Sequence, residues 1–130
     1  DGLGHGDNTK AAFMTRGLAE IARLAVKAGA DPMTLSGLAG MGDLIATCSS
    51  KRSRNHYVGE QLASGKSLDE ILAGMKNVAE GIDTTAAAVR LSARMGVEMP
   101  IAAATYEVLF NGVPIQQAVA DLLGRAPSPE

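Results

Sequence analysis

The 130-residue sequence has few of the residues that mark disulfide-rich, membrane-spanning, metal-binding or nucleic-acid-binding proteins. Its single cysteine, Cys48, excludes an internal disulfide and suits a reducing compartment, so we expect a cytoplasmic protein. No apolar run reaches transmembrane length, and no signal peptide is recognisable. A net charge of −2 is too balanced to predict binding to nucleic acid or membranes. Two histidines, His5 and His56, form no metal-binding pattern.

Aromatic residues make up only 3% of the chain, although 46% of it is hydrophobic. The core must therefore be mainly aliphatic, and the many alanines favour closely packed helices. No segment alternates β-branched residues with a period of two. We predict an all-α fold, a compact multi-helix domain of seven or eight unequal helices over residues 1–125, long enough to bury roughly two-thirds of its unfolded surface. Residues 126–130 (APSPE) have the composition of a disordered tail.

The longest predicted helix covers residues 7–28, where apolar and charged residues occupy separate faces. The apolar face carries Met14, Leu18, Ile21 and Ala25, and the charged face Arg16, Glu20, Arg23 and Lys27. Lys10, near the start of this helix, is expected to be solvated. Shorter helices are predicted from Pro32 to about Leu38 and over residues 43–48, the latter burying Leu44 and Ile45. Capping residues and prolines predict later helix starts at Ser53, Ser67, Asp83 or Thr84, Pro100 and Pro114.

The stretch that best suggests a function is residues 40–55 (GMGDLIATCSSKRSRN). Asp43 and Thr47 are four residues apart, so a helix places them on one face, with Asp43 facing inward or into a cleft. Ser53 is predicted to cap the next helix, whose first turn holds Arg54 and Asn55. Free N–H groups and the helix dipole at such a start favour an anion such as phosphate. The alternative is a capped helix-turn-helix with a solvated basic loop.

The glycine-rich opening, residues 1–6 (DGLGHG), is not a dinucleotide fingerprint. Its glycines are spaced G-x-G-x-G, no strand precedes them, and no acidic residue closes a βαβ unit. Such glycines suit close packing or a break between helices. Because the chain begins at Asp1, within what reads as a motif, we expect it to be a piece of a longer protein.

Five segments of the chain, in order, resemble one family, the C-terminal substrate domain of bacterial NAD(P)-dependent glycerol-3-phosphate dehydrogenases. The segments are residues 1–12 (DGLGHGDNTKAA), 40–44 (GMGDL) with Thr47 and Cys48, 53–55 (SRN), 78–81 (VAEG) and 96–101 (GVEMPI). The resemblance covers all but the last few residues. It implies an enzyme that interconverts dihydroxyacetone phosphate and sn-glycerol 3-phosphate with NAD or NADP and so supplies phospholipid synthesis. It also implies an N-terminal Rossmann domain, absent from this chain, and a possible homodimer.

The resemblance implies a catalytic role for Asp43. This residue matches a family aspartate that lies near the catalytic lysine in the substrate site. That lysine precedes the opening motif and is outside this chain; Lys10 does not match it. An opposite charge close by favours the protonated form of a lysine, so Asp43 would orient the lysine and keep it charged. The fragment alone is therefore expected to be inactive.

Other residues match ligand-binding positions of the family. Substrate binding is implied for Asp43, Thr47, Ser53, Arg54 and Asn55. Cofactor contacts, made when the two domains close, are implied for Arg54, Val78 and Glu80.

Two alternatives stay open. One is the helical domain of a related 2-hydroxy acid or sugar-acid dehydrogenase, although residues 53–55 favour a phosphate-bearing substrate. The other is a helical interaction module without enzymatic activity, which a solvent-facing Asp43 would favour.

Overall fold

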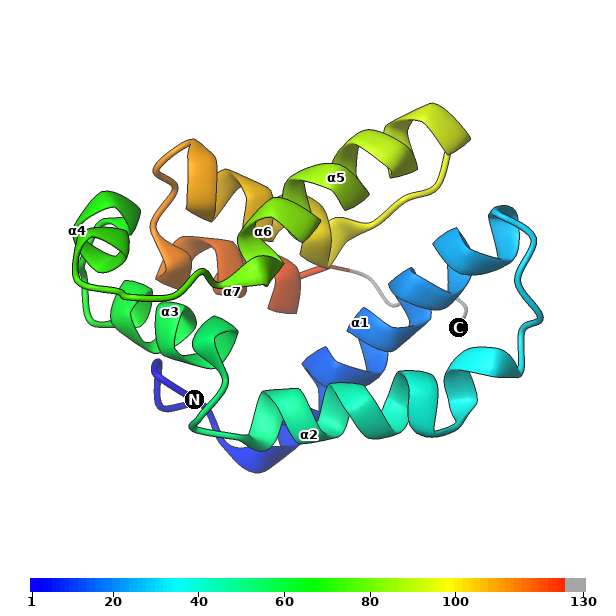
Figure 1. Ribbon diagram of the computed structural model, residues 1–130, viewed down its shortest axis with the longest axis horizontal. Coiled ribbons are helices and arrows are strands. Elements are labelled where there is room, and N and C mark those ends of the chain that lie inside the picture. The colour runs from blue at the N-terminus through cyan, green and yellow to red at the C-terminus, as the bar shows by residue number, and fades with distance from the viewer. Residues whose placement is uncertain (126–130) are drawn as a thin grey trace.

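Seven α-helices and no strands make up the part of the chain that the computed structural model describes, residues 1–125 without the side chains of residues 38 and 39 (Figure 1). The helices are α1 (Asp7–Lys27), α2 (Asp43–Ser49), α3 (Arg54–Ala63), α4 (Leu68–Ala73), α5 (Glu80–Met95), α6 (Pro100–Phe110) and α7 (Ile115–Leu123). The predicted all-α fold is confirmed. The tail predicted over residues 126–130 lies outside the described residues. None of the described helices is both long and apolar enough to span a membrane.

Two helices hold the others together. Helix α6 packs against α1, α5 and α7, while α3 packs against α4, α5 and α7 (Figure 1). Helix α2 packs on α1 and connects, through a polar turn, to the start of α3. The starts of α3 and α5 are thus brought together by packing, although more than 20 residues separate them in the chain.

Local signals in the sequence predict several helix ends correctly. The Ser53 Oγ accepts a hydrogen bond from the backbone N–H of His56 at 3.3 Å and caps α3. Ser67 does the same for α4, accepting from the N–H of Glu70 at 3.2 Å. Helix α5 ends at Gly96, whose φ of 68° is a left-handed conformation that suits glycine.

Two predicted helix boundaries are wrong. In place of a helix from Pro32, the chain forms a 3-10 turn, Thr34–Ser36, and then a π-helical turn, Leu38–Gly42. Here the backbone of Gly40 packs so closely on that of Leu35 that a side chain at position 40 would overlap it. Helix α5 begins at Glu80 and not at Asp83 or Thr84, because a side chain from α3 caps it, as described below.

The buried core is small and lies between α3, α4 and the start of α5. Its buried members are Val58, Ile71 and Ala79, and the partly buried side chains packed around them are Leu62, Leu68, Met75, Ile82 and Leu109. The predicted inward positions of Ile21 and Ile45 are wrong, since these side chains are 43% and 47% exposed. Short helices rich in alanine enclose little apolar volume, so several large apolar side chains remain exposed to solvent.

Glu20 was predicted to lie on the charged face of α1 with Arg16, Arg23 and Lys27, but it is buried. Its side chain is only 4% exposed, and its two carboxylate oxygens accept hydrogen bonds from the backbone N–H groups of Ile101 (2.6 Å) and Ala102 (3.2 Å). Glu20 thereby caps α6, whose own N-cap residue, Met99, makes no side-chain bond. Burial raises the pKa of the Glu20 carboxyl, although the two N–H donors act in the opposite direction. One charged side chain therefore ties α1 to α6.

We predict that Glu20→Ala destabilises the protein, because it leaves two partly buried N–H groups at the start of α6 without an acceptor. The free energy of unfolding, measured by urea denaturation, should fall by about 2–3 kcal/mol. The exposed Glu98 offers a matched control, and Glu98→Ala should change the free energy of unfolding by less than about 0.5 kcal/mol. Equal losses of unfolding free energy in the two variants would show that capping of α6 by Glu20 does not stabilise the protein.

Candidate functional site

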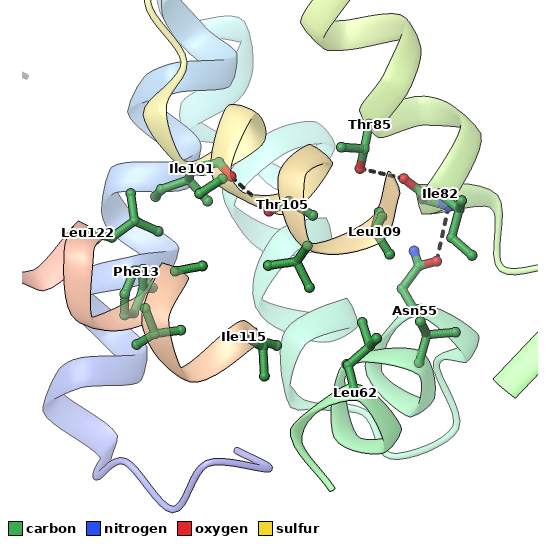
Figure 2. A pocket seen from close by; sticks show the side chains of 17 residues that line it. Phe13, Asn55, Leu62, Ile82, Thr85, Ile101, Thr105, Leu109, Ile115 and Leu122 are labelled. Atoms are coloured by element: carbon green, nitrogen blue, oxygen red, sulfur yellow. Dashed lines mark hydrogen bonds between the residues drawn. The ribbon is translucent and has the colours of Figure 1, made fainter. Parts of the chain in front are cut away.

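The candidate site is built where the starts of α3 and α5 meet. Asn55, in the first turn of α3, accepts a hydrogen bond through Oδ1 from the backbone N–H of Gly81 at 3.0 Å (Figure 2). Gly81 lies in the first turn of α5. Each helix start carries the positive end of a helix dipole and backbone N–H groups without helical partners. Two such starts side by side favour a negatively charged ligand.

Positively charged side chains surround the start of α3. Arg54 is exposed at the first position of the helix, and Lys51 and Arg52 are exposed in the turn before it. This turn is held by the N–H of Arg52, which donates to the Ser50 hydroxyl at 3.2 Å. Within the described residues, none of the three cations forms an ion pair. They can therefore contact an anion without first breaking an internal contact.

Asp43 and Thr47 lie on α2 in different environments. Thr47 is half-buried and lines a cavity of about 540 Å³ between α1, α2, α3 and α6, which Asn55 also lines. Asp43 is exposed, so the prediction that it faces inward or into a cleft is wrong for this chain. Met41, in the π-helical turn, and Ile45, on α2, are 45% and 47% exposed, so apolar side chains two residues away from Asp43 on either side also reach solvent.

Cys48 is half-buried beside Thr47 and lines the same cavity. Burial raises the pKa of its thiol, although the charge of Lys10 acts against this. A thiol that stays protonated is a poor nucleophile, and no role in the reaction follows for it.

Val78 and Glu80 precede and open α5, on the segment that Asn55 contacts through Gly81. Val78 is 66% exposed, and Glu80 is exposed as the first residue of the helix. The structure therefore brings residues 53–55 and 78–81 together. Asp43 is exposed on α2 and is not among the residues that line the cavity shared by Thr47 and Asn55.

A charged cluster next to Asn55 was missed by the sequence analysis. The Asp1 Oδ2 lies 2.8 Å from both the Lys10 Nζ and the His56 Nε2, and the His56 Nδ1 is 3.5 Å from the Glu60 Oε1. Lys10 is therefore paired, where solvation was expected. The cluster ties the opening segment to α1 and α3. Its members are up to 55 residues apart in sequence, so no local pattern could have predicted it.

We predict that Ser53→Ala weakens the start of α3, because the N–H of His56 loses its acceptor. The free energy of unfolding should fall by about 1 kcal/mol, measured by thermal or urea denaturation. Ser49, exposed at the last position of α2, is the matched control, and Ser49→Ala should have no measurable effect. A larger loss for Ser49→Ala than for Ser53→Ala would contradict the capping role.

The described part of the chain is an all-helical domain in which two neighbouring helix starts favour an anion. In the comparison with known families, residues 1–120 match the model described as NAD-dependent glycerol-3-phosphate dehydrogenase C-terminus. The chain belongs to this family.

Relatives and a solved structure support the same assignment. Over its full length the chain is 58% identical to glycerol-3-phosphate dehydrogenase [NAD(P)+] of Chlorobium limicola, and over 96% of its length 58% identical to that of Bacillus cytotoxicus. It covers 39% and 37% of these proteins. A crystal structure of glycerol-3-phosphate dehydrogenase from Coxiella burnetii matches 96% of this chain and 38% of that one, with a TM-score of 0.92 and 38% identity. The chain thus spans about two-fifths of the length of its relatives.

Proposed function

We propose that this chain is the substrate-binding domain of an enzyme that interconverts dihydroxyacetone phosphate and sn-glycerol 3-phosphate. The observation that carries the proposal is the junction of the two helix starts, where the Asn55 carboxamide meets the Gly81 N–H beside the exposed Arg54. Membership of the dehydrogenase family supports the same substrate. The product would serve glycerophospholipid synthesis in the cytoplasm.

Residues 53–55 are proposed to hold the substrate phosphate. The planar guanidinium of Arg54 can donate two parallel hydrogen bonds to phosphate oxygens, which a lysine cannot do. The Asn55 Nδ2 is a further donor, because Oδ1 is already engaged by Gly81. Thr47 would contribute its hydroxyl from the wall of the shared cavity.

The exposed residues before and at the start of α5 fit a dinucleotide. NAD(P)H would supply the hydride to the substrate carbonyl carbon. Glu80 offers a carboxylate that can accept hydrogen bonds from sugar hydroxyls, and Val78 offers apolar surface next to it. Arg54, close by on α3, would contact both the cofactor and the substrate phosphate.

Asp43 is proposed to act through a lysine of the N-terminal domain. Reduction of a ketone places negative charge on the carbonyl oxygen, so a protonated lysine beside it can donate a proton. A carboxylate near that lysine would orient it and keep it charged. The N-terminal domain is proposed to cover Asp43, and the exposed apolar side chains of Met41 and Ile45 support a contact of this part of the chain with another domain. Asp43 would then be solvent-facing only in the chain taken by itself.

The assay that tests the proposed function is oxidation of NADH and NADPH by the full-length enzyme. Dihydroxyacetone phosphate should be reduced, while unphosphorylated dihydroxyacetone should be reduced poorly, because it lacks the group that residues 53–55 bind. Equal turnover of both ketones would show that residues 53–55 do not bind the substrate phosphate. No turnover of either, by a folded enzyme that binds dinucleotide, would point to a 2-hydroxy acid or sugar-acid dehydrogenase.

We predict that Asp43→Ala lowers kcat of the full-length enzyme by at least about 100-fold, the usual range for loss of general acid–base assistance. Folding should be nearly unchanged, since Asp43 is exposed. Asp121, exposed on α7, provides the control, and Asp121→Ala should leave kcat unaltered. Steady-state kinetics and circular dichroism measure these effects, and near-normal turnover of Asp43→Ala would rule out its role.

We predict that Arg54→Lys raises the KM for dihydroxyacetone phosphate by about tenfold, because lysine keeps the charge but cannot form the paired hydrogen bonds. Because Arg54 is also proposed to contact the cofactor, the assay is run at saturating NADH or NADPH, where turnover of unphosphorylated dihydroxyacetone should not change. Arg90 is exposed on α5, and Arg90→Lys serves as the matched control. An unchanged KM for the phosphorylated ketone would argue against contact between Arg54 and phosphate.

A further inference from the structure

Helix α5 is capped by a side chain from another helix. Its N-cap residue, Ala79, makes no side-chain hydrogen bond. Asn55 supplies the missing acceptor, because its Oδ1 receives the N–H of Gly81 at 3.0 Å. The carbonyl of Gly81 in turn accepts from the Thr85 hydroxyl at 2.6 Å (Figure 2). The peptide groups on both sides of residue 81 are therefore fixed.

The contact between Asn55 and position 81 leaves no space for a side chain. A Cβ at position 81 would lie 2.8 Å from the Cγ and Oδ1 of Asn55, and 2.9 Å from its Nδ2. Gly81 does not have a positive φ, so the requirement for glycine here is one of space and not of backbone conformation. An alanine at this position would displace the carboxamide of Asn55.

The Gly81 N–H decides which end of the carboxamide faces a ligand. A backbone N–H can bond only to the oxygen of Asn55, so the NH₂ group occupies the other side. Within the described residues, this NH₂ group donates to nothing, and Asn55 is exposed. A carboxamide turned the other way would present its oxygen to the ligand, and an oxygen repels phosphate.

From this geometry we propose that Gly81 is a positioning residue for substrate binding. It acts through Asn55, which it orients as a hydrogen-bond donor to the substrate phosphate. The inference rests on the proposed function of residues 53–55. It also explains how the segment proposed to contact the cofactor is joined to the segment proposed to bind substrate.

The test is a double-mutant cycle in the full-length enzyme, with Gly81→Ala, Asn55→Ala and the two combined. Gly81→Ala should lower kcat/KM for dihydroxyacetone phosphate by about tenfold, mainly through KM, as expected for loss of a hydrogen bond to a charged group. In the Asn55→Ala background, Gly81→Ala should lower kcat/KM by less than about twofold, because the methyl group of the alanine then has space. Turnover of unphosphorylated dihydroxyacetone should not respond to Gly81→Ala.

Gly17 is the matched control for a glycine-to-alanine change. It lies within α1, and a Cβ there would meet no atom within 4 Å beyond its own helix. Gly17→Ala should leave kcat/KM unchanged. If Gly81→Ala does not fold but the double variant does, the recovery supports the proposal; if neither folds, Gly81 does not act through Asn55.

Three results would overturn the proposal. They are an unchanged kcat/KM in Gly81→Ala, an equal loss in both backgrounds, and an effect of the same size with unphosphorylated dihydroxyacetone. Hydrogen exchange of the Gly81 amide separates the contact from its function, since exchange should accelerate in Asn55→Ala. If the Gly81 amide exchanges at the same rate in Asn55→Ala as in the unmutated enzyme, and the unmutated enzyme reduces dihydroxyacetone phosphate normally, the contact is overturned and the proposed function is not. If exchange accelerates in Asn55→Ala but the unmutated enzyme does not reduce dihydroxyacetone phosphate, the proposed function is overturned, and the positioning role with it.

Discussion

The backbone N–H groups at the starts of α5 and α6 depend on acceptors from other helices. Neither helix has an N-cap residue with a side-chain acceptor in use, since these positions are Ala79 and Met99. Glu20 from α1 supplies the acceptors for α6, and Asn55 from α3 supplies that for α5. A buried N–H without a partner costs about 1–3 kcal/mol, and this cost bears most on the partly buried Glu20 bonds. The Asn55 bond is more exposed, and together the two contacts join α1 to α6 and α3 to α5.

The same dependence gives the candidate site its form. Where Asn55 caps α5, the starts of two helices lie together, and their dipoles add to the charge of Arg54. The capping bond uses the Asn55 oxygen and leaves its NH₂ group for a ligand. A contact that stabilises the fold therefore also sets the hydrogen-bonding character of the site. In the proposed function, substrate binding and helix capping are coupled through the Asn55 side chain.

Local features could be predicted from the sequence, and remote contacts could not. The Ser53 and Ser67 caps and the Gly96 helix end depend on residues within one turn, so spacing alone indicates them. The Glu20 and Asn55 caps join residues 81 and 26 apart, and an acceptor so distant has no local signature. Glu20 follows the charged repeat of α1 and was placed with it on the solvated face. Whether Asp43 is exposed depends on how α2 packs on the rest of the domain, which spacing along the chain does not reveal.

The most direct test of the account is a crystal structure of the full-length enzyme with dihydroxyacetone phosphate and a reduced nicotinamide cofactor bound. We expect the phosphate at the start of α3, within hydrogen-bond distance of the Arg54 guanidinium and the Asn55 Nδ2, with the Asn55 Oδ1 still bonded to the Gly81 N–H. Asp43 should lie beside a lysine of the N-terminal domain. A phosphate bound elsewhere, with residues 53–55 facing solvent, would contradict the account.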